Sequence, residues 1–96
     1  MEIVLSDKAR SDLLRIHRYL DERSPSAADA FIRRIDKSFQ NLVRFPFIGR
    51  ERSRFAPGIR CLVAGLHLIF YTVGADQITI VRVIDGRMDV DEEFYR

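Results

Sequence analysis

The sequence predicts an α+β domain in which an antiparallel two-helix hairpin packs on one face of an antiparallel sheet. In the first half of the chain, apolar residues recur at helical spacing. In the second half, short runs rich in β-favouring residues are divided by glycine-containing turns. A short apolar run at residues 3–5 precedes the helices, and we expect it to join the sheet at an edge. The 96 residues make a single domain, 1–96.

The first helix is expected from Asp7 to Asp21, because Ser6 can cap it and one apolar stripe runs along it. That stripe consists of Ala9, Leu13, Ile16 and Leu20. Proline at position 25 breaks this helix, and a second helix is expected from about Ser26 to Arg44. Its apolar face is broad enough to contact both the first helix and a sheet. A short connection between two helices predicts an antiparallel hairpin.

Three strands are expected after the helices, at Ile59–Val63, Leu66–Val73 and Gln77–Ile84. Tight turns between consecutive strands predict antiparallel pairing in a meander. We expect the segment 49–54 to be a polar loop, and the acidic tail 87–96 to form a short helical turn.

Both faces of the predicted sheet are rich in apolar side chains, although the hairpin can cover only one. Alternation is expected to place one set of third-strand side chains on a common face: Ile78, Ile80, Arg82 and Ile84. The face that the hairpin leaves is covered either by Phe94, Tyr95 and nearby loops, or by a partner, because large exposed apolar patches usually mark interaction sites.

Composition narrows the classes of function. The net charge of +2 and the pI near 9.0 permit an acidic partner, but they do not call for direct binding of nucleic acid. A single cysteine, Cys61, allows no internal disulfide, and no apolar run reaches membrane-spanning length, so we expect a cytoplasmic protein. The spacing of His17, His67 and Cys61 matches no metal motif, and no cofactor is expected.

Several local motifs, in their order and spacing, resemble the ParE branch of the ParE/RelE toxins over essentially the whole chain. They are Ala9 with Asp12-Leu13, Ala27–Phe31, Leu42–Gly49 with Phe45-Pro46, Pro57–Arg60, Ile69–Tyr71, Ile80–Ile84 and Asp85–Asp89. The chain departs from the family pattern at two positions: Asp85 stands where histidine is usual, and Met88 where a second arginine is usual.

The resemblance implies the toxin of a type II toxin–antitoxin system, held inactive in a hetero-oligomer with a ParD-like antitoxin. It further implies a non-enzymatic toxin that binds DNA gyrase. The candidate residues for target binding are Arg60, Arg82, Arg87, Met88 and Asp89. The candidates for antitoxin binding are Leu14, Tyr19, Leu68, Phe70, Ile78 and Ile80. Two alternatives stay open: Arg87 and Asp89 could instead pair with each other, and Leu14 and Tyr19 could pack within the hairpin.

Two other functions remain to be tested. A RelE-like, ribosome-dependent mRNA endonuclease would need a base, an acid and cations around the scissile phosphate. Arg60 and Arg82 could contact phosphates and Tyr95 lies near the tail position of such enzymes, but Met88 stands where an arginine is expected. The departures at Asp85 and Met88 also allow a toxin-derived protein that binds an antitoxin and has lost toxicity.

Overall fold

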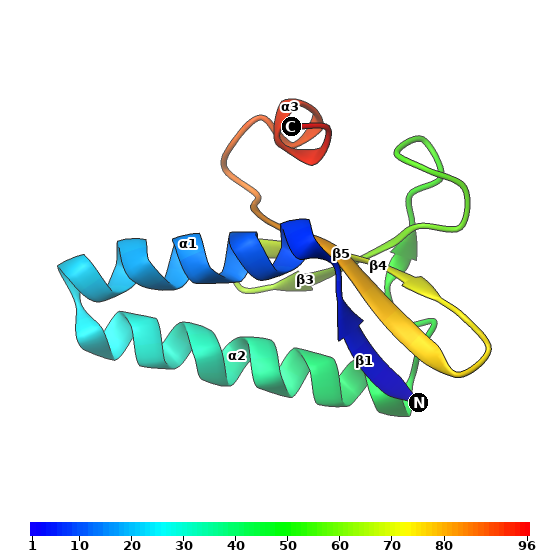
Figure 1. Ribbon diagram of the computed structural model, residues 1–96, viewed down its shortest axis with the longest axis horizontal. Coiled ribbons are helices and arrows are strands. Elements are labelled where there is room, and N and C mark those ends of the chain that lie inside the picture. Colours follow the sequence, from blue (N-terminus) through cyan, green and yellow to red (C-terminus); the bar gives the residue numbers. More distant parts are fainter.

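The computed structural model describes all 96 residues and has the predicted α+β architecture (Figure 1). The elements in chain order are β1 (Glu2–Leu5), α1 (Asp7–Arg23), α2 (Pro25–Arg44), β2 (Arg50–Glu51), β3 (Arg60–Ala64), β4 (His67–Val73), β5 (Gln77–Asp85) and α3 (Val90–Phe94). In Figure 1, α1 and α2 lie side by side, with the sheet between α2 and the short α3.

Two serines define the helical hairpin. The side chain of Ser6 accepts a hydrogen bond from the Ala9 amide at 3.0 Å, which caps α1. Ser24 is the C-cap of α1 and also the N-cap of α2, where it accepts from the Ala27 amide at 3.3 Å. One residue between the helices forces them to turn back on each other, so the predicted hairpin is confirmed.

The sheet has the strand order β1-β5-β4-β3-β2. The meander β3-β4-β5 is antiparallel as predicted, and β1 joins it at an edge, parallel to β5. Strand β2, which pairs with β3, lies in the segment predicted as a polar loop. Two residues are too few to show a period in sequence, so only the pairing with β3 defines this strand.

The main core lies between the helical hairpin and one face of the sheet. Its fully buried members include Phe31 of α2 and both Ile78 and Ile80 of β5. The prediction that these two isoleucines lie on an open face available to an antitoxin is therefore wrong. An irregularity opposite Phe70 and Tyr71 shifts the register of β5, so Ile84 falls on the opposite face from Ile80. A single bulge thus interrupts the alternation from which the face was predicted.

The second face of the sheet carries a smaller apolar cluster, which the chain covers itself. Phe55, from the loop before β3, and Phe94, from α3, pack over Phe70 with ring centroids 5.0 and 5.1 Å away. Phe70 is completely buried and Leu68 is partly buried, so neither presents the open surface that was predicted for antitoxin binding. Of the two predicted coverings for this face, the loop and the tail form the actual one.

None of the helices combines the length and the apolar character that a membrane span requires.

Candidate functional site

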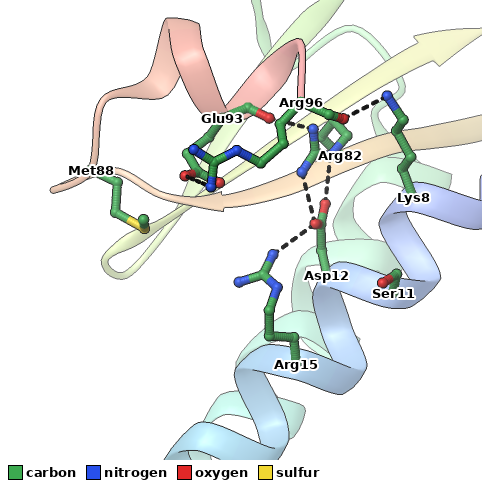
Figure 2. A pocket seen from close by; sticks show the side chains of 8 residues that line it. All are labelled: Lys8, Ser11, Asp12, Arg15, Arg82, Met88, Glu93 and Arg96. Atoms are coloured by element: carbon green, nitrogen blue, oxygen red, sulfur yellow. Dashed lines mark hydrogen bonds and ion pairs between the residues drawn. The ribbon is translucent and has the colours of Figure 1, made fainter.

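A buried ion pair joins the helical hairpin, the sheet and the tail. Arg82 of β5 donates to both carboxylate oxygens of Asp12 in α1, at 2.8 and 2.9 Å, and both side chains are at least nine-tenths buried. Asp12 also accepts from the Val83 amide at 2.9 Å. The remaining end of the guanidinium donates to the carbonyl oxygens of Glu93 and Phe94 in α3 (Figure 2). The hydrogen bonds to the Asp12 carboxylate raise the pKa of Arg82, although burial opposes them, and keep its charge fixed.

The geometry of this pair corrects one predicted role. Arg82 was expected to contact a target, but its donors are used inside the molecule and it is closed off from solvent. Asp12 was overlooked as a structural residue, although it lies next to Leu13 of the buried stripe of α1. A carboxylate on the buried side of an amphipathic helix is the sequence signal that could have indicated an internal partner.

A polar pocket of about 380 Å³ opens beside this ion pair, and the side chains around it are shown in Figure 2. Its cations already have partners. Arg15 donates to Asp12 at 2.9 Å, Lys8 donates to the Arg96 carbonyl at 2.8 Å, and Arg96 pairs with Glu92 and Glu93. These contacts around the pocket therefore hold the tail against α1.

The segment after β5 forms a local pair different from the predicted one. Arg87 donates twice to the carboxylate of Asp85, at 3.1 and 2.7 Å, and its amide adds a third bond at 2.9 Å. These bonds hold the pKa of Asp85 at about 2. Asp89 instead caps α3 by accepting from the Glu92 amide at 3.2 Å, so the alternative of an Arg87–Asp89 pair is wrong. The aspartate that departs from the family pattern thus orients Arg87.

An apolar groove of about 750 Å³ lies between the hairpin and the β3–β4 turn. Its apolar lining consists of Ile16, Tyr19, Leu20, Ala27, Ala30, Phe31, Leu66 and Met88. Asp85 and three arginines also line it, but Arg15 is already paired with Asp12 and Arg87 with Asp85, which leaves Arg34 as the unpaired cation. The groove therefore combines an apolar bed with the one unpaired cation of Arg34, a combination that suits an apolar protein segment carrying a carboxylate.

His67 lines this groove, and one of its ring nitrogens is buried without a partner. The ring lies edge-on to Phe31, with centroids 4.8 Å apart, and Nδ1 is buried without a hydrogen-bond partner. Burial lowers the pKa of His67, and the nearby Asp85 only partly opposes that effect. Buried polar atoms normally have partners, so this nitrogen is an exception within the folded chain.

The structure brings together some of the predicted site residues and separates others. Tyr19, predicted to bind the antitoxin, lines the same groove as Arg87 and Met88, which were predicted to bind the target. Leu14 is exposed but lies outside the groove. Arg60 lies elsewhere, where it donates to the carbonyl oxygens of Phe47 and Gly49 at 3.3 and 2.8 Å.

The histidines and the cysteine do not converge. The structure contains no cluster of three or more histidine, cysteine, aspartate or glutamate side chains that could hold a metal ion. Cys61 is buried in the second-face cluster, and burial raises the pKa of its thiol. His67, by contrast, packs on Phe31 beneath the hairpin.

Comparison with known proteins decides the family. Residues 3–90 match the family model described as the ParE toxin of the type II toxin–antitoxin system parDE. The chain belongs to the ParE toxin family. The toxin ParE3 of Caulobacter vibrioides is 30% identical over 89 residues, which is 92% of this chain and 89% of that toxin. The toxin ParE1 of Mycobacterium tuberculosis is 40% identical over 65 residues, or 67% of this chain and 66% of that one.

A solved structure shows the same fold as this ParE-family chain. It belongs to a chromosomal ParDE toxin–antitoxin system from P. aeruginosa, with a TM-score of 0.73 and 23% sequence identity. The match covers 88% of this chain and 95% of that one, so the α+β architecture of the ParE family extends over nearly the whole molecule.

Proposed function

We propose that this ParE-family chain is a toxin that inhibits DNA gyrase by binding to it, and that a ParD-like antitoxin neutralises it by docking in the apolar groove. The observation that carries the proposal is the shared lining of that groove. Tyr19, Arg87 and Met88 all contribute to it, so one occupant would cover a predicted antitoxin residue and two predicted target residues together. Neutralisation would then follow from simple occlusion.

The chemistry of the groove specifies the antitoxin segment. An apolar helix or strand bearing a carboxylate would bury its apolar side chains on Tyr19 and Leu66 and pair with Arg34. Such a segment, disordered when free, would fold on binding and give a large negative heat-capacity change.

The partners of the charged side chains support inhibition by binding rather than catalysis. RNA cleavage needs free cations and a base that converge on one phosphate. Arg82 is neutralised by Asp12, and Arg60 is bound to backbone carbonyls. The tail tyrosine, Tyr95, donates to the Phe55 carbonyl at 3.1 Å and so anchors the tail.

The decisive test is a plasmid supercoiling assay with purified gyrase, ATP and the chain freed of antitoxin. We expect supercoiling to fall and linearised DNA to accumulate, and one equivalent of ParD-like antitoxin should reverse both effects. Folded protein that leaves gyrase unaffected would contradict the proposal. Cleavage of ribosome-bound mRNA, or expression without growth arrest, would then favour the endonuclease or the loss of toxicity.

A matched pair of variants tests the groove separately. Tyr19 and Leu14 are both exposed side chains of α1, but only Tyr19 lines the groove. Calorimetric titration with the ParD-like antitoxin should show weaker binding for Tyr19→Ala, by about tenfold or more, and little change for Leu14→Ala. Equal losses in both variants would mean that the antitoxin covers the outer face of α1 instead.

A further inference from the structure

An exposed apolar surface lies at the C-terminal end of α2 and in the turn that follows it. Phe47 is 64% exposed, Phe45 55% and Ile48 46%, and Val43 of the last helical turn is also exposed. We call these four side chains the apolar turn. Contiguous exposed apolar residues of this size usually mark a surface that another molecule covers.

The backbone beneath the apolar turn is held rigidly. The buried hydroxyl of Tyr71 accepts from the Gly49 amide and donates to the Pro46 carbonyl, both at 2.8 Å. Arg60 binds the carbonyl oxygens of Phe47 and Gly49. A side chain at Gly49 would place its Cβ 2.5 Å from the Tyr71 hydroxyl oxygen, so only glycine fits there. The molecule thus fixes the turn and still leaves its aromatic rings exposed.

Rigid display of large side chains lowers the entropy cost of binding, because little freedom is left to lose. Exposed phenylalanines on a backbone held by hydrogen bonds are therefore suited to enter a pocket on a partner as anchors. A turn whose only role was to connect α2 to β2 would need neither the Tyr71 hydrogen bonds nor two exposed aromatic rings.

The charged side chains around the apolar turn indicate what kind of partner would bind it. Arg44 lies over the Phe45 ring at 5.4 Å and Arg60 over the Phe47 ring at 5.0 Å. Arg50 follows the turn, and the nearest carboxylate in sequence, Glu51, is bound to the Ser53 hydroxyl at 2.8 Å. The surface that would complement the apolar turn is an apolar pocket rimmed by carboxylates. Such a pocket belongs to a protein and not to a nucleic acid.

The apolar turn is separate from the groove. The groove uses the N-terminal half of α2, up to Arg34, whereas the turn begins at Val43. Val43 lies nine positions after Arg34, which places it roughly 14 Å farther along the helix axis. In Figure 1 the connection between α1 and α2 lies at the left and the C-terminal end of α2 at the right. A segment lying in the groove would leave the apolar turn exposed.

We propose that the apolar turn is a second docking surface, which inserts Phe45 and Phe47 into an acid-rimmed apolar pocket of the inhibited target. This inference rests on the proposed function, in which that target is DNA gyrase. It adds a contact that is independent of the groove and that an antitoxin in the groove does not cover.

The test uses the double variant Phe45→Ala/Phe47→Ala of the full chain in the supercoiling assay with purified gyrase. The control is Val63→Ala, an equally exposed apolar residue that lies outside both the turn and the groove. We expect the concentration for half-inhibition to rise at least tenfold in the double variant and to stay within twofold in the control. Arg44→Glu/Arg50→Glu should also weaken inhibition, and more strongly at low salt than at high salt.

Each other outcome overturns the inference in a distinguishable way. Unchanged inhibition by a double variant that melts like the wild type removes the apolar turn from the target surface and leaves the proposed function intact. If the folded wild-type chain has no effect on gyrase, both the second docking surface and the proposed function are excluded. A matching loss of affinity for the ParD-like antitoxin assigns the turn to the antitoxin. A shift from dimer to monomer in gel filtration of the double variant assigns it to a second copy of the chain.

Discussion

The two faces of the sheet are covered by very different amounts of chain. On one face, two helices of 17 and 20 residues enclose the larger cluster, with Phe31 and Leu42 fully buried. On the other, a loop and the five-residue α3 cover the smaller cluster, chiefly through Phe55 and Phe94. A five-residue helix is too short to be stable by itself, so it depends on its contacts with the sheet.

The difference shows how a small domain can bury a second apolar face of its sheet without a second layer of helices. Arg82 connects the two coverings, because it binds Asp12 of the hairpin and the last carbonyls of α3 together. We therefore expect the hairpin face to set the global stability, and the tail face to open locally at lower cost.

The largest effects on stability should come from removing one buried ring from each of the two coverings of the sheet. Phe31→Ala removes a fully buried ring between the helices and the sheet, and should cost about 3–5 kcal/mol of the free energy of unfolding. Phe94→Ala should cost less, about 2 kcal/mol, because α3 can move toward the space that the ring leaves. Urea denaturation of both variants measures the difference.

Hydrogen exchange provides the control for this pair. Phe94→Ala should speed exchange of α3 amides while the amides of α2 remain protected. If Phe94→Ala destabilises the chain as much as Phe31→Ala and exposes both regions together, the two coverings form one cooperative unit and the distinction is invalid.

The next effect concerns the connection between the coverings. Asp12→Leu leaves the buried Arg82 guanidinium without its counter-ion and should lower the free energy of unfolding by about 3 kcal/mol. This is the lower end for such losses, because two backbone carbonyls still accept hydrogen bonds from Arg82. The double variant Asp12→Leu/Arg82→Met should recover much of that loss, because no buried charge remains unpaired. A double variant less stable than the single one would show that the ion pair itself is a net source of stability.

A smaller effect should come from one hydroxyl beneath the hairpin face. Tyr71→Phe leaves the Gly49 amide and the Pro46 carbonyl without their partner, and should cost about 1–2 kcal/mol. The loss should appear as faster exchange of the Gly49 amide. Thr72→Val, a half-buried neighbour on the same strand, serves as the control. An unprotected Gly49 amide in the wild type would contradict the rigid turn.

The smallest effect depends on pH. Burial lowers the pKa of His67 below the usual value near 6.5, so protons bind the unfolded chain more readily than the folded one. Stability should therefore be fully present above about pH 6.5 and decline as the pH falls below it. Urea midpoints at pH 7 and pH 5 should differ more for the wild type than for His67→Leu; an equal pH dependence would assign the titration to another group.

The sequence by itself determined the helices and every strand except β2, their order and the family. Helical periodicity, serine caps and glycine turns act over a few residues, so they could be recognised without knowing the fold. The helices begin and end close to their predicted limits, and the motifs from Asp12 to Asp89 led to the ParE family that the comparisons show.

Only the tertiary structure decided which residues meet. The bulge in β5 places Ile80 and Ile84 on opposite faces, and a bulge depends on pairing between strands rather than on local sequence. Asp12 and Arg82 are 70 residues apart and meet only because α1 crosses β5. Tyr19, Arg87 and Met88 share a groove for the same reason: packing between distant segments creates surfaces that periodicity within one segment does not encode.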